Sequence, residues 1–198
     1  MVRIDDSGDE VKCWMDYPNE VDQLIDEMRE QSWEARIAGL IMGKLGTRAS
    51  GVVTARPKNL TYNSKGEYWQ LKIYAKNTKG GGKTVRDVYV PEQVKRELDN
   101  YQRERDLRPS DPYVDKSVDT VRRWVREAGD RLSQQGSDRW DHVSSHDFRR
   151  SWATYHLVEQ DRSPRVMMEI GGWDSMEAME PYMSKPSPSK IAEEMQDD

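Results

Sequence analysis

Cysteine is almost absent from this chain, since Cys13 is the only one in 198 residues. A single thiol excludes an internal disulfide and a zinc site built from cysteines. Long apolar runs are also missing: no 18 consecutive residues are apolar, and the opening MVRIDDSGDE has no hydrophobic stretch of the kind found in a secretory signal. These absences predict a cytoplasmic protein with no membrane partner, and its length suits one domain with its own core.

Acidic residues are nearly missing from one stretch of an otherwise acidic chain. Residues 36–86 hold eleven Lys and Arg but a single acid, Glu67, whereas residues 1–35 hold eleven acids against three basic residues. The net charge of −5 and the pI of about 5.4 hide this positive block. Such a block is typical of a surface that binds a polyanion. We therefore expect a nucleic-acid partner, with a merely solvated basic face as the alternative.

The spacing of apolar residues predicts helices first, then a small sheet, then helices again. Helices are expected over residues 18–28, 33–46, 49–55, 91–101, 118–134, 145–155 and 163–170. Strands rich in aromatic and β-branched residues are expected over 60–62, 68–74 and 85–90. Ser32 and Ser145 are placed to cap two of the helices. This order predicts an α+β fold, mainly α, with a three-stranded antiparallel sheet.

The two ends of the chain differ from its middle. Residues 1–17 are acidic and aperiodic, which predicts a loose tail. Residues 185–198 contain Pro186 and Pro188 and predict an extended arm with a short acidic end. Residues 18–184 are left as the folded domain.

Four short motifs follow one another along this domain. The first two are an arginine in a tight turn (Arg48) and a lysine-rich hairpin (Lys76, Lys79 and Lys83). The third is a His-x-x-Arg pair on one helix face (His146 and Arg149), and the fourth is a Gly-Gly-Trp turn (Trp173) with a tyrosine nine residues later (Tyr182). No motif is specific alone, but their order, spacing and predicted secondary structure resemble the catalytic domain of the tyrosine recombinase, or phage integrase, family. The resemblance covers residues 18–184 and implies the fold of that domain.

The resemblance also implies a role for each residue. Tyr182 takes the place of the nucleophile, and four side chains take the places that hold the scissile phosphate and handle the proton (Arg48, His146, Arg149 and Trp173). Alignment from the preceding strand gives Lys76 as the catalytic lysine, whereas alignment from the following strand puts it between Lys79 and Lys83. Lys76 is the first choice and Lys79 the second.

These residue types suit the attack of a phenol on a phosphodiester. Two guanidinium groups can bind the non-bridging oxygens, where negative charge grows. A tyrosine with the ordinary pKa of about 10 is only ~0.1% ionised at pH 7, so Tyr182 needs a proton acceptor, for which His146 is the candidate. A lysine can protonate the departing 5′-oxygen. No metal and no cofactor is required, and the sequence shows no clustered set of metal ligands.

Each of these residues, taken alone, also has a simpler interpretation. Trp173 and Tyr182 could simply pack in the core, and His146 could cap its own helix. Arg149 could form a local ion pair with Asp147 or Glu169. The ordered set favours the functional interpretation over these separate ones.

The sequence therefore predicts an enzyme: a site-specific DNA recombinase or integrase that breaks and rejoins DNA through a covalent 3′-phosphotyrosyl intermediate. Gly51 stands three residues after Arg48, where the family usually has an acid. A recombinase-derived DNA-binding protein without activity is accordingly one alternative. A type IB topoisomerase-like enzyme, which shares most of this chemistry, is the other.

Double-stranded DNA is the expected partner. Further phosphate contacts are expected from basic residues of the positive block, namely Lys44, Arg56, Lys58, Lys79 and Lys83. Recombination joins two duplexes, so a tetramer is expected on DNA and a monomer in its absence. The family usually has a helical DNA-binding domain ahead of the catalytic one, and about 17 residues precede the first predicted helix here, so weak DNA affinity is expected of this chain alone.

Overall fold

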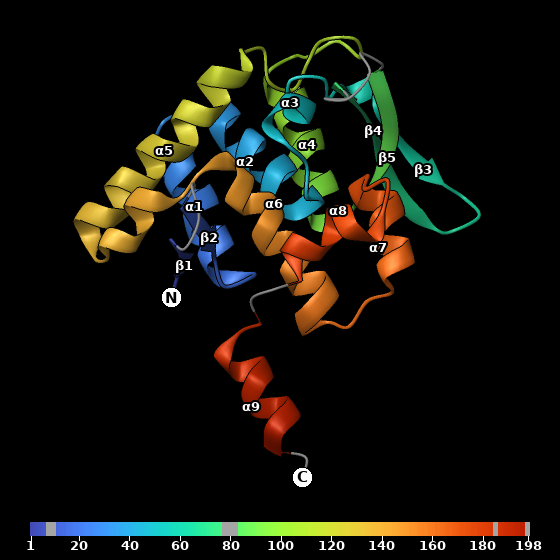
Figure 1. Ribbon diagram of the computed structural model, residues 1–198. Coiled ribbons are helices and arrows are strands. Elements are labelled where there is room, and N and C mark those ends of the chain that lie inside the picture. The colour runs from blue at the N-terminus through green and yellow to red at the C-terminus, as the bar shows by residue number, and fades with distance from the viewer. Residues whose placement is uncertain (7–10, 77–82, 184–185, 197–198) are drawn as a thin grey trace.

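The computed structural model describes residues 1–6, 11–76, 83–183 and 186–196 (Figure 1). Its helices are α1 (Asn19–Arg29), α2 (Trp33–Leu45), α3 (Ala49–Val52), α4 (Glu92–Glu104), α5 (Val118–Gln135), α6 (Ser145–Thr154), α7 (Pro164–Gly171), α8 (Met176–Met179) and α9 (Pro188–Gln196). Short helical turns are η1 (Pro57–Asn59), η2 (Asp138–His142), η3 (Tyr155–Glu159) and η4 (Glu180–Tyr182). This mainly helical architecture with one three-stranded antiparallel sheet confirms the predicted fold class.

The three-stranded sheet lies on one side of the helical body (Figure 1). Its strands are β3 (Leu60–Asn63), β4 (Tyr68–Lys76) and β5 (Lys83–Val90), paired in the order β3-β4-β5. Leu71 pairs with Val88, both fully buried, while Tyr74 and Tyr89 are exposed on the opposite face. The alternation of buried and exposed residues fits a sheet with one face on the core.

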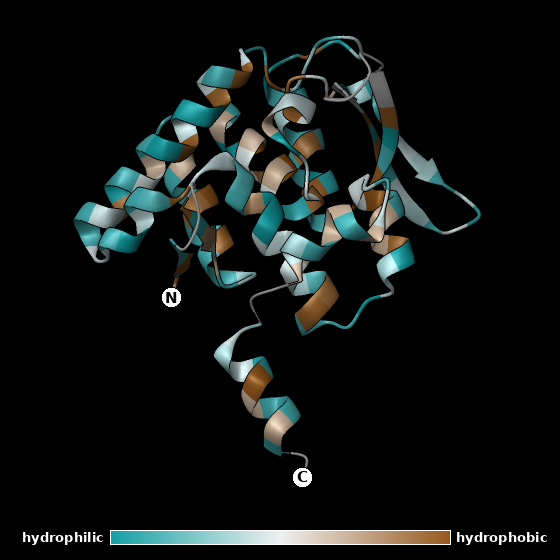
Figure 2. Ribbon diagram, in the orientation of Figure 1, coloured by the Kyte–Doolittle hydropathy of each residue, from teal (hydrophilic) through white to brown (hydrophobic). Residues whose placement is uncertain are grey.

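Helix α2 is the centre of the core. Nine of its residues are buried, so it is covered on nearly all sides. Gly43 lets two other helices approach it, because a Cβ there would lie 2.8 Å from Val21 of α1 and 3.0 Å from Phe148 of α6. By contrast, Figure 2 shows a hydrophilic outer face on α5, whose apolar residues are buried against the body. The core thus fixes α6, the helix of the His-x-x-Arg pair, against α2.

The loose N-terminal tail predicted for residues 1–17 is wrong. Strands β1 (Arg3–Asp5) and β2 (Lys12–Trp14) form an antiparallel pair, and Cys13, Trp14 and Met15 are at most 1% exposed. The amide of Cys13 donates to Asp147 Oδ1 at 3.1 Å, and that of Met15 donates to Ser151 Oγ at 2.8 Å. These partners lie on α6, more than 130 positions away. No local pattern in so short a segment could reveal them.

The extended C-terminal arm predicted for residues 185–198 is wrong for the part that is described. Pro188 opens helix α9, and Ser187 Oγ accepts from the amide of Lys190 at 3.0 Å. Lys190 then pairs with Glu194 at 2.7 Å. A proline in the first turn of a helix costs little, because its missing N–H has no partner there in any case. The second proline thus starts a helix where an extended segment was expected.

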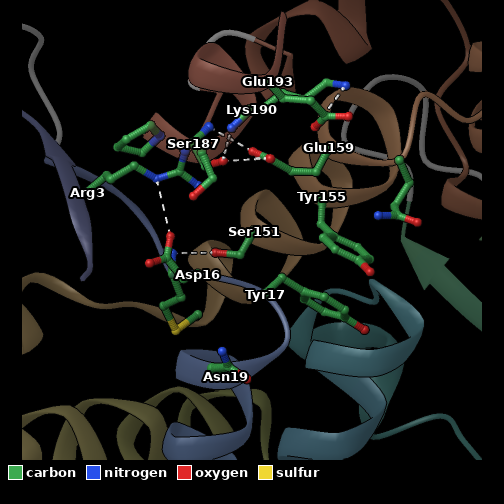
Figure 3. A pocket seen from close by; sticks show the side chains of 14 residues that line it. Arg3, Asp16, Tyr17, Asn19, Ser151, Tyr155, Glu159, Ser187, Lys190 and Glu193 are labelled. Carbon is green, nitrogen blue, oxygen red and sulfur yellow. Dashed lines mark hydrogen bonds and ion pairs between the residues drawn. The ribbon is translucent and has the colours of Figure 1, made fainter. Parts of the chain in front are cut away.

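A polar cavity of about 490 Å³ separates α9 from the body (Figure 3). The amide and hydroxyl of Ser187 both donate to the carboxylate of Glu159, each at 2.7 Å, and Tyr17 stacks on Tyr155 at 4.4 Å. The cavity lies beside the N-terminal strands and contains none of the residues singled out for catalysis. Across the described residues, no helix is long and apolar enough to cross a membrane.

Candidate active site

Helix α6 carries His146 and Arg149, and a capping box holds its first turn. The N-cap is Ser144, whose amide and hydroxyl donate to Asp147 Oδ2 at 2.8 and 2.7 Å. The prediction of Ser145 as the cap is wrong by one residue, because Ser145 is already helical and 7% exposed. The cap fixes where the helix begins, and hence which face carries the His-x-x-Arg pair.

Arg149 is fully buried, and most of its hydrogen-bonding capacity is unused. Its Nη1 donates to the carbonyl of Gly46 at 2.7 Å. Its Nε and Nη2 are buried without a hydrogen-bond partner anywhere in the described part of the chain. Burial, assisted by repulsion from Arg86 and Arg48, lowers the pKa of Arg149 to about 9, whereas Tyr182 acts in the opposite direction. The guanidinium is still protonated at neutral pH, so it is a buried cation with two unmatched donors.

Trp173 packs its indole against this guanidinium. The chain leaves α7 at Gly172, which has a φ of +67° and is suited to glycine, and Trp173 follows with 6% exposure. The Cζ of Arg149 lies 4.0 Å from the centroid of the Trp173 ring. The indole Nε1 is buried and finds no acceptor among the described residues. A cation–π contact therefore joins two side chains that both have donors to spare.

Tyr182 lies against the same indole. It belongs to η4, is half-buried, and its ring meets that of Trp173 edge-on with centroids 5.2 Å apart. The Cζ of Arg149 is 5.8 Å from the Tyr182 ring. The Tyr182 carbonyl accepts from Thr154 Oγ1, which in turn accepts from Nε1 of Trp14 at 3.1 Å. The N-terminal strand β2 therefore anchors the backbone of this tyrosine through Thr154.

Arg48 comes from the turn between α2 and α3. It is the N-cap residue of α3, two positions after Gly46, which ends α2 with a φ of +62°. Gly46 also leaves space for Trp152, because a Cβ at that position would lie 2.3 Å from the indole. The Arg48 guanidinium has no hydrogen bond or ion pair with any described residue. It lies close enough to Arg149 and His146 to lower the pKa of both.

The glycine that replaces the family's usual acid has a structural reason. A Cβ on Gly51 would lie 3.2 Å from Ile73 Cδ1, so α3 packs directly on β4. Thr54 holds the end of this turn, since its Oγ1 accepts from the amide of Tyr74 at 3.0 Å. The turn that carries Arg48 is therefore supported by packing and by Thr54, without a carboxylate.

His146 keeps solvent access at the first turn of α6. Partial burial lowers its pKa below the ordinary value, and the positive charges of Arg48, Arg150 and Arg149 lower it further. The imidazole is therefore neutral at pH 7 and can accept a proton.

The simpler ion pairs considered for Arg149 are not formed. Asp147 is bound to Ser144, to the amide of Cys13 and to Arg150. Glu169 is exposed and makes no ion pair with any described residue. The described residues also hold no group of three His, Cys, Asp or Glu side chains placed to bind a metal ion.

The sequence model of the phage integrase family matches residues 16–187. The chain belongs to the phage integrase family. A search of curated proteins gave no match.

Solved recombinases share the fold of this integrase-family domain. XerA recombinase superposes with a TM-score of 0.69 at 17% identity, over 93% of this chain and 64% of that one. The Tn1549 transposon integrase in complex with transposon right end DNA has a TM-score of 0.68 at 14% identity, over 98% of this chain and 67% of that one. A lambda integrase dimer bound to a core site has a TM-score of 0.61 at 17% identity, over 86% of this chain and 48% of that one. The present chain thus spans about half to two thirds of the length of these proteins.

The first candidate for the catalytic lysine lies at the end of a strand. Lys76 is the last residue of β4 and pairs in register with Lys83, the first residue of β5. The second candidate, Lys79, lies outside the described residues.

The other basic residues expected at the DNA have different surroundings. Lys44 pairs with Asp22 at 2.5 Å and lies 4.9 Å above the ring of Tyr17, so we leave it out of the interface proposed below. Arg56 Nη1 donates to the carbonyl of Thr54 at 3.0 Å. Lys58 is exposed, and its ammonium forms no ion pair with the described residues.

Arg86 was not among the predicted site residues. Strand β5 buries every second residue, and Arg86 falls in the inward register of Val88 and Val90, paired with buried Ile73. A charged residue at an inward position of a strand is a signal that the sequence does contain. Arg86 joins Arg48 and Arg149 in what we call the arginine cluster, because Arg48 lowers the pKa of Arg86 and both of them lower the pKa of Arg149.

Proposed function

We propose that this chain is the catalytic domain of a site-specific DNA recombinase or integrase, which breaks one DNA strand through a covalent 3′-phosphotyrosyl intermediate. The observation that carries the proposal is the contact of Tyr182 and Trp173 with Arg149, a buried guanidinium that has two unpaired nitrogens. Buried donors without acceptors are costly in a folded protein. A phosphate supplies the missing acceptors.

In the proposed step, the Tyr182 oxygen attacks the scissile phosphorus and loses its proton to His146. The bond from phosphorus to the 5′-oxygen breaks, and that oxygen takes a proton from the hairpin lysine, with Lys76 as the first choice. Arg48 and Arg149 hold the non-bridging oxygens, where negative charge accumulates. The reverse reaction, with a 5′-hydroxyl as the nucleophile, rejoins the strand. No cofactor takes part in either direction.

Double-stranded DNA is the proposed partner, bound by the arginine cluster and by Arg56, Lys58, Lys79 and Lys83. The structural neighbours support this, since they include an XerH recombinase bound to difH substrate and a lambda integrase dimer bound to a core site. We propose a tetramer on DNA and a monomer alone. Helix α9 supports self-association, because its Ile191 is 50% and its Met195 68% exposed.

The direct test is capture of the covalent adduct. A library of duplexes with randomised flanks and a 5′-bridging phosphorothiolate is incubated with the protein, since a thiolate leaves without needing a proton and does not rejoin well. We expect a protein–DNA band that resists denaturation and is lost in Tyr182→Phe. Tyr101→Phe, on α4 and remote from the site, is the matched control and should keep the band.

The outcomes separate the alternatives. Salt-sensitive DNA binding with no adduct on any duplex would favour the inactive DNA-binding protein. Relaxation of supercoiled plasmid without preference for a sequence would favour a type IB topoisomerase. A comparison of Lys76→Ala on ordinary and phosphorothiolate duplexes then tests the lysine, because only the ordinary 5′-oxygen needs its proton.

A further inference from the structure

We propose that Arg86 is a third phosphate-binding arginine of this site, placed on β5 to contact the scissile phosphate together with Arg48 and Arg149. The proposal rests on the function proposed above. It assigns a substrate contact to a side chain of the β4–β5 hairpin that the sequence prediction did not single out.

The position of Arg86 in the sheet is the first observation. Its inward neighbours on β5 are Val88 and Val90, and the residue opposite is Ile73, all of them at most 1% exposed. An arginine in this register extends from the core face of the sheet. The sheet therefore carries a cation on the face that is packed against the helices.

The packing of Arg86 against the Gly-Gly-Trp turn is the second observation. A Cβ on Gly172 would lie 2.5 Å from Nη1 of Arg86 and 2.8 Å from its Cδ. Contacts this short cannot be accommodated without moving the guanidinium. Gly172 is thus required twice, by its φ of +67° and by the arginine that passes over it. The next residue is Trp173, whose ring contacts Arg149.

The lack of a counter-ion is the third observation. The Nε of Arg86 is buried without a hydrogen-bond partner, and its guanidinium forms no ion pair with any residue that the structure describes. Burial lowers the pKa of Arg86 to about 10, and Arg48 contributes further. The three guanidiniums remain charged at neutral pH and repel one another. An anion between them would remove this repulsion and supply acceptors to Arg86, Arg149 and Trp173.

A purely structural role makes the opposite prediction. If the Arg86 stem only filled the space over Gly172, its replacement would lower stability whether or not an anion is present. If Arg86 binds phosphate, removing this largely buried guanidinium, which forms no ion pair with the described residues, should leave the anion-free protein as stable as before, or more stable. The phosphate-dependent part of the stability should then fall.

The experiment measures the melting temperature of Arg86→Gln across a titration of inorganic phosphate at constant ionic strength. We expect the wild-type chain to be stabilised by phosphate, and the apparent Kd to rise about tenfold or more in Arg86→Gln. Arg86→Lys keeps the positive charge but loses the planar guanidinium with its paired donors, so its apparent Kd should lie between those of the wild type and Arg86→Gln. Arg131→Gln, which removes a partly buried arginine paired with Glu27, is the control and should keep the wild-type Kd.

The same variants are then tested for adduct formation on the phosphorothiolate duplex, where Arg86→Gln should be slowed about a hundredfold. No phosphate effect on the wild-type chain, or a wild-type Kd in Arg86→Gln, would overturn the proposal. A wild-type chain that forms no adduct but whose phosphate binding depends on Arg86 would instead refute the proposed function and leave the anion site standing.

Discussion

Arg149 and Arg150 are neighbours on one helix, yet they lie in opposite electrostatic environments. Arg150 is on the side of α6 that faces the N-terminal strands, where it pairs with Asp147 and lies 5.3 Å above the ring of Trp14. Arg149 is on the side of Trp173 and Tyr182, where the described residues offer it no carboxylate. One helix therefore separates a neutralised region from a positively charged one.

This difference separates the arginines of the fold into two groups, those with acidic partners and those without. Those that hold elements together have acidic partners, as with Arg131 and Glu27 between α5 and α1. Those of the arginine cluster have no acidic partner in the part of the chain that the structure describes. An unpaired buried charge lowers stability, so it persists where a ligand supplies the opposite charge. Substitution of arginines on the two sides of α6 tests this difference in charge pairing.

The largest effect is expected from Arg149→Gln. We expect adduct formation to fall by about a thousandfold or more, because the guanidinium stabilises charge in the transition state. The free energy of unfolding should change by less than about 1 kcal/mol, since the lost hydrogen bond to Gly46 is offset by the removal of an unpaired charge. Single-turnover rates and urea unfolding measure the two quantities. A large loss of stability with adduct formation retained would show that Arg149 is a structural residue and does not bind the phosphate.

Arg150→Gln should show the opposite pattern. It leaves the fully buried carboxylate of Asp147 without its cation, so the free energy of unfolding should fall by about 3 kcal/mol. The adduct rate per folded molecule should stay within about threefold of wild type, because Arg150 lies on the neutralised side. Urea unfolding is the measurement, and Arg96→Gln, exposed on α4, is the control. Equal stabilities of Arg150→Gln and Arg96→Gln would contradict this assignment.

The smallest expected effect is a shift in the pH dependence of His146. Its lowered pKa keeps the imidazole neutral at pH 7, so the adduct rate should decline at a lower pH than it would with a histidine of ordinary pKa. NMR can measure this pKa directly, because the chain has only three histidines. Arg48→Gln removes a nearby positive charge and should raise the pKa of His146. A pKa of His146 at or above the ordinary 6.5 would show that the positive region does not extend to this residue.

Local patterns predicted most of the fold. The helix expected over 118–134 is α5 at Val118–Gln135, and the strand expected over 85–90 lies within β5 at Lys83–Val90. These elements have strong periodicity and clear boundary residues, which are local properties. The strands of residues 1–17 were missed because their hydrogen-bond partners lie on α6. Helix α9 was missed because Pro188 was taken as a mark of extended chain rather than of a helix start.

The sequence by itself determined the order of the motifs, the faces of the helices and the place of the positive block, because each depends on residues close together along the chain. Only the tertiary structure decided which arginines are neutralised and which are not. Arg131 pairs with the carboxylate of Glu27 across 104 positions, while Arg149 meets no carboxylate among the described residues and donates to the carbonyl of Gly46 across 103. Charge pairing depends on distance in space, and packing of the core sets that distance.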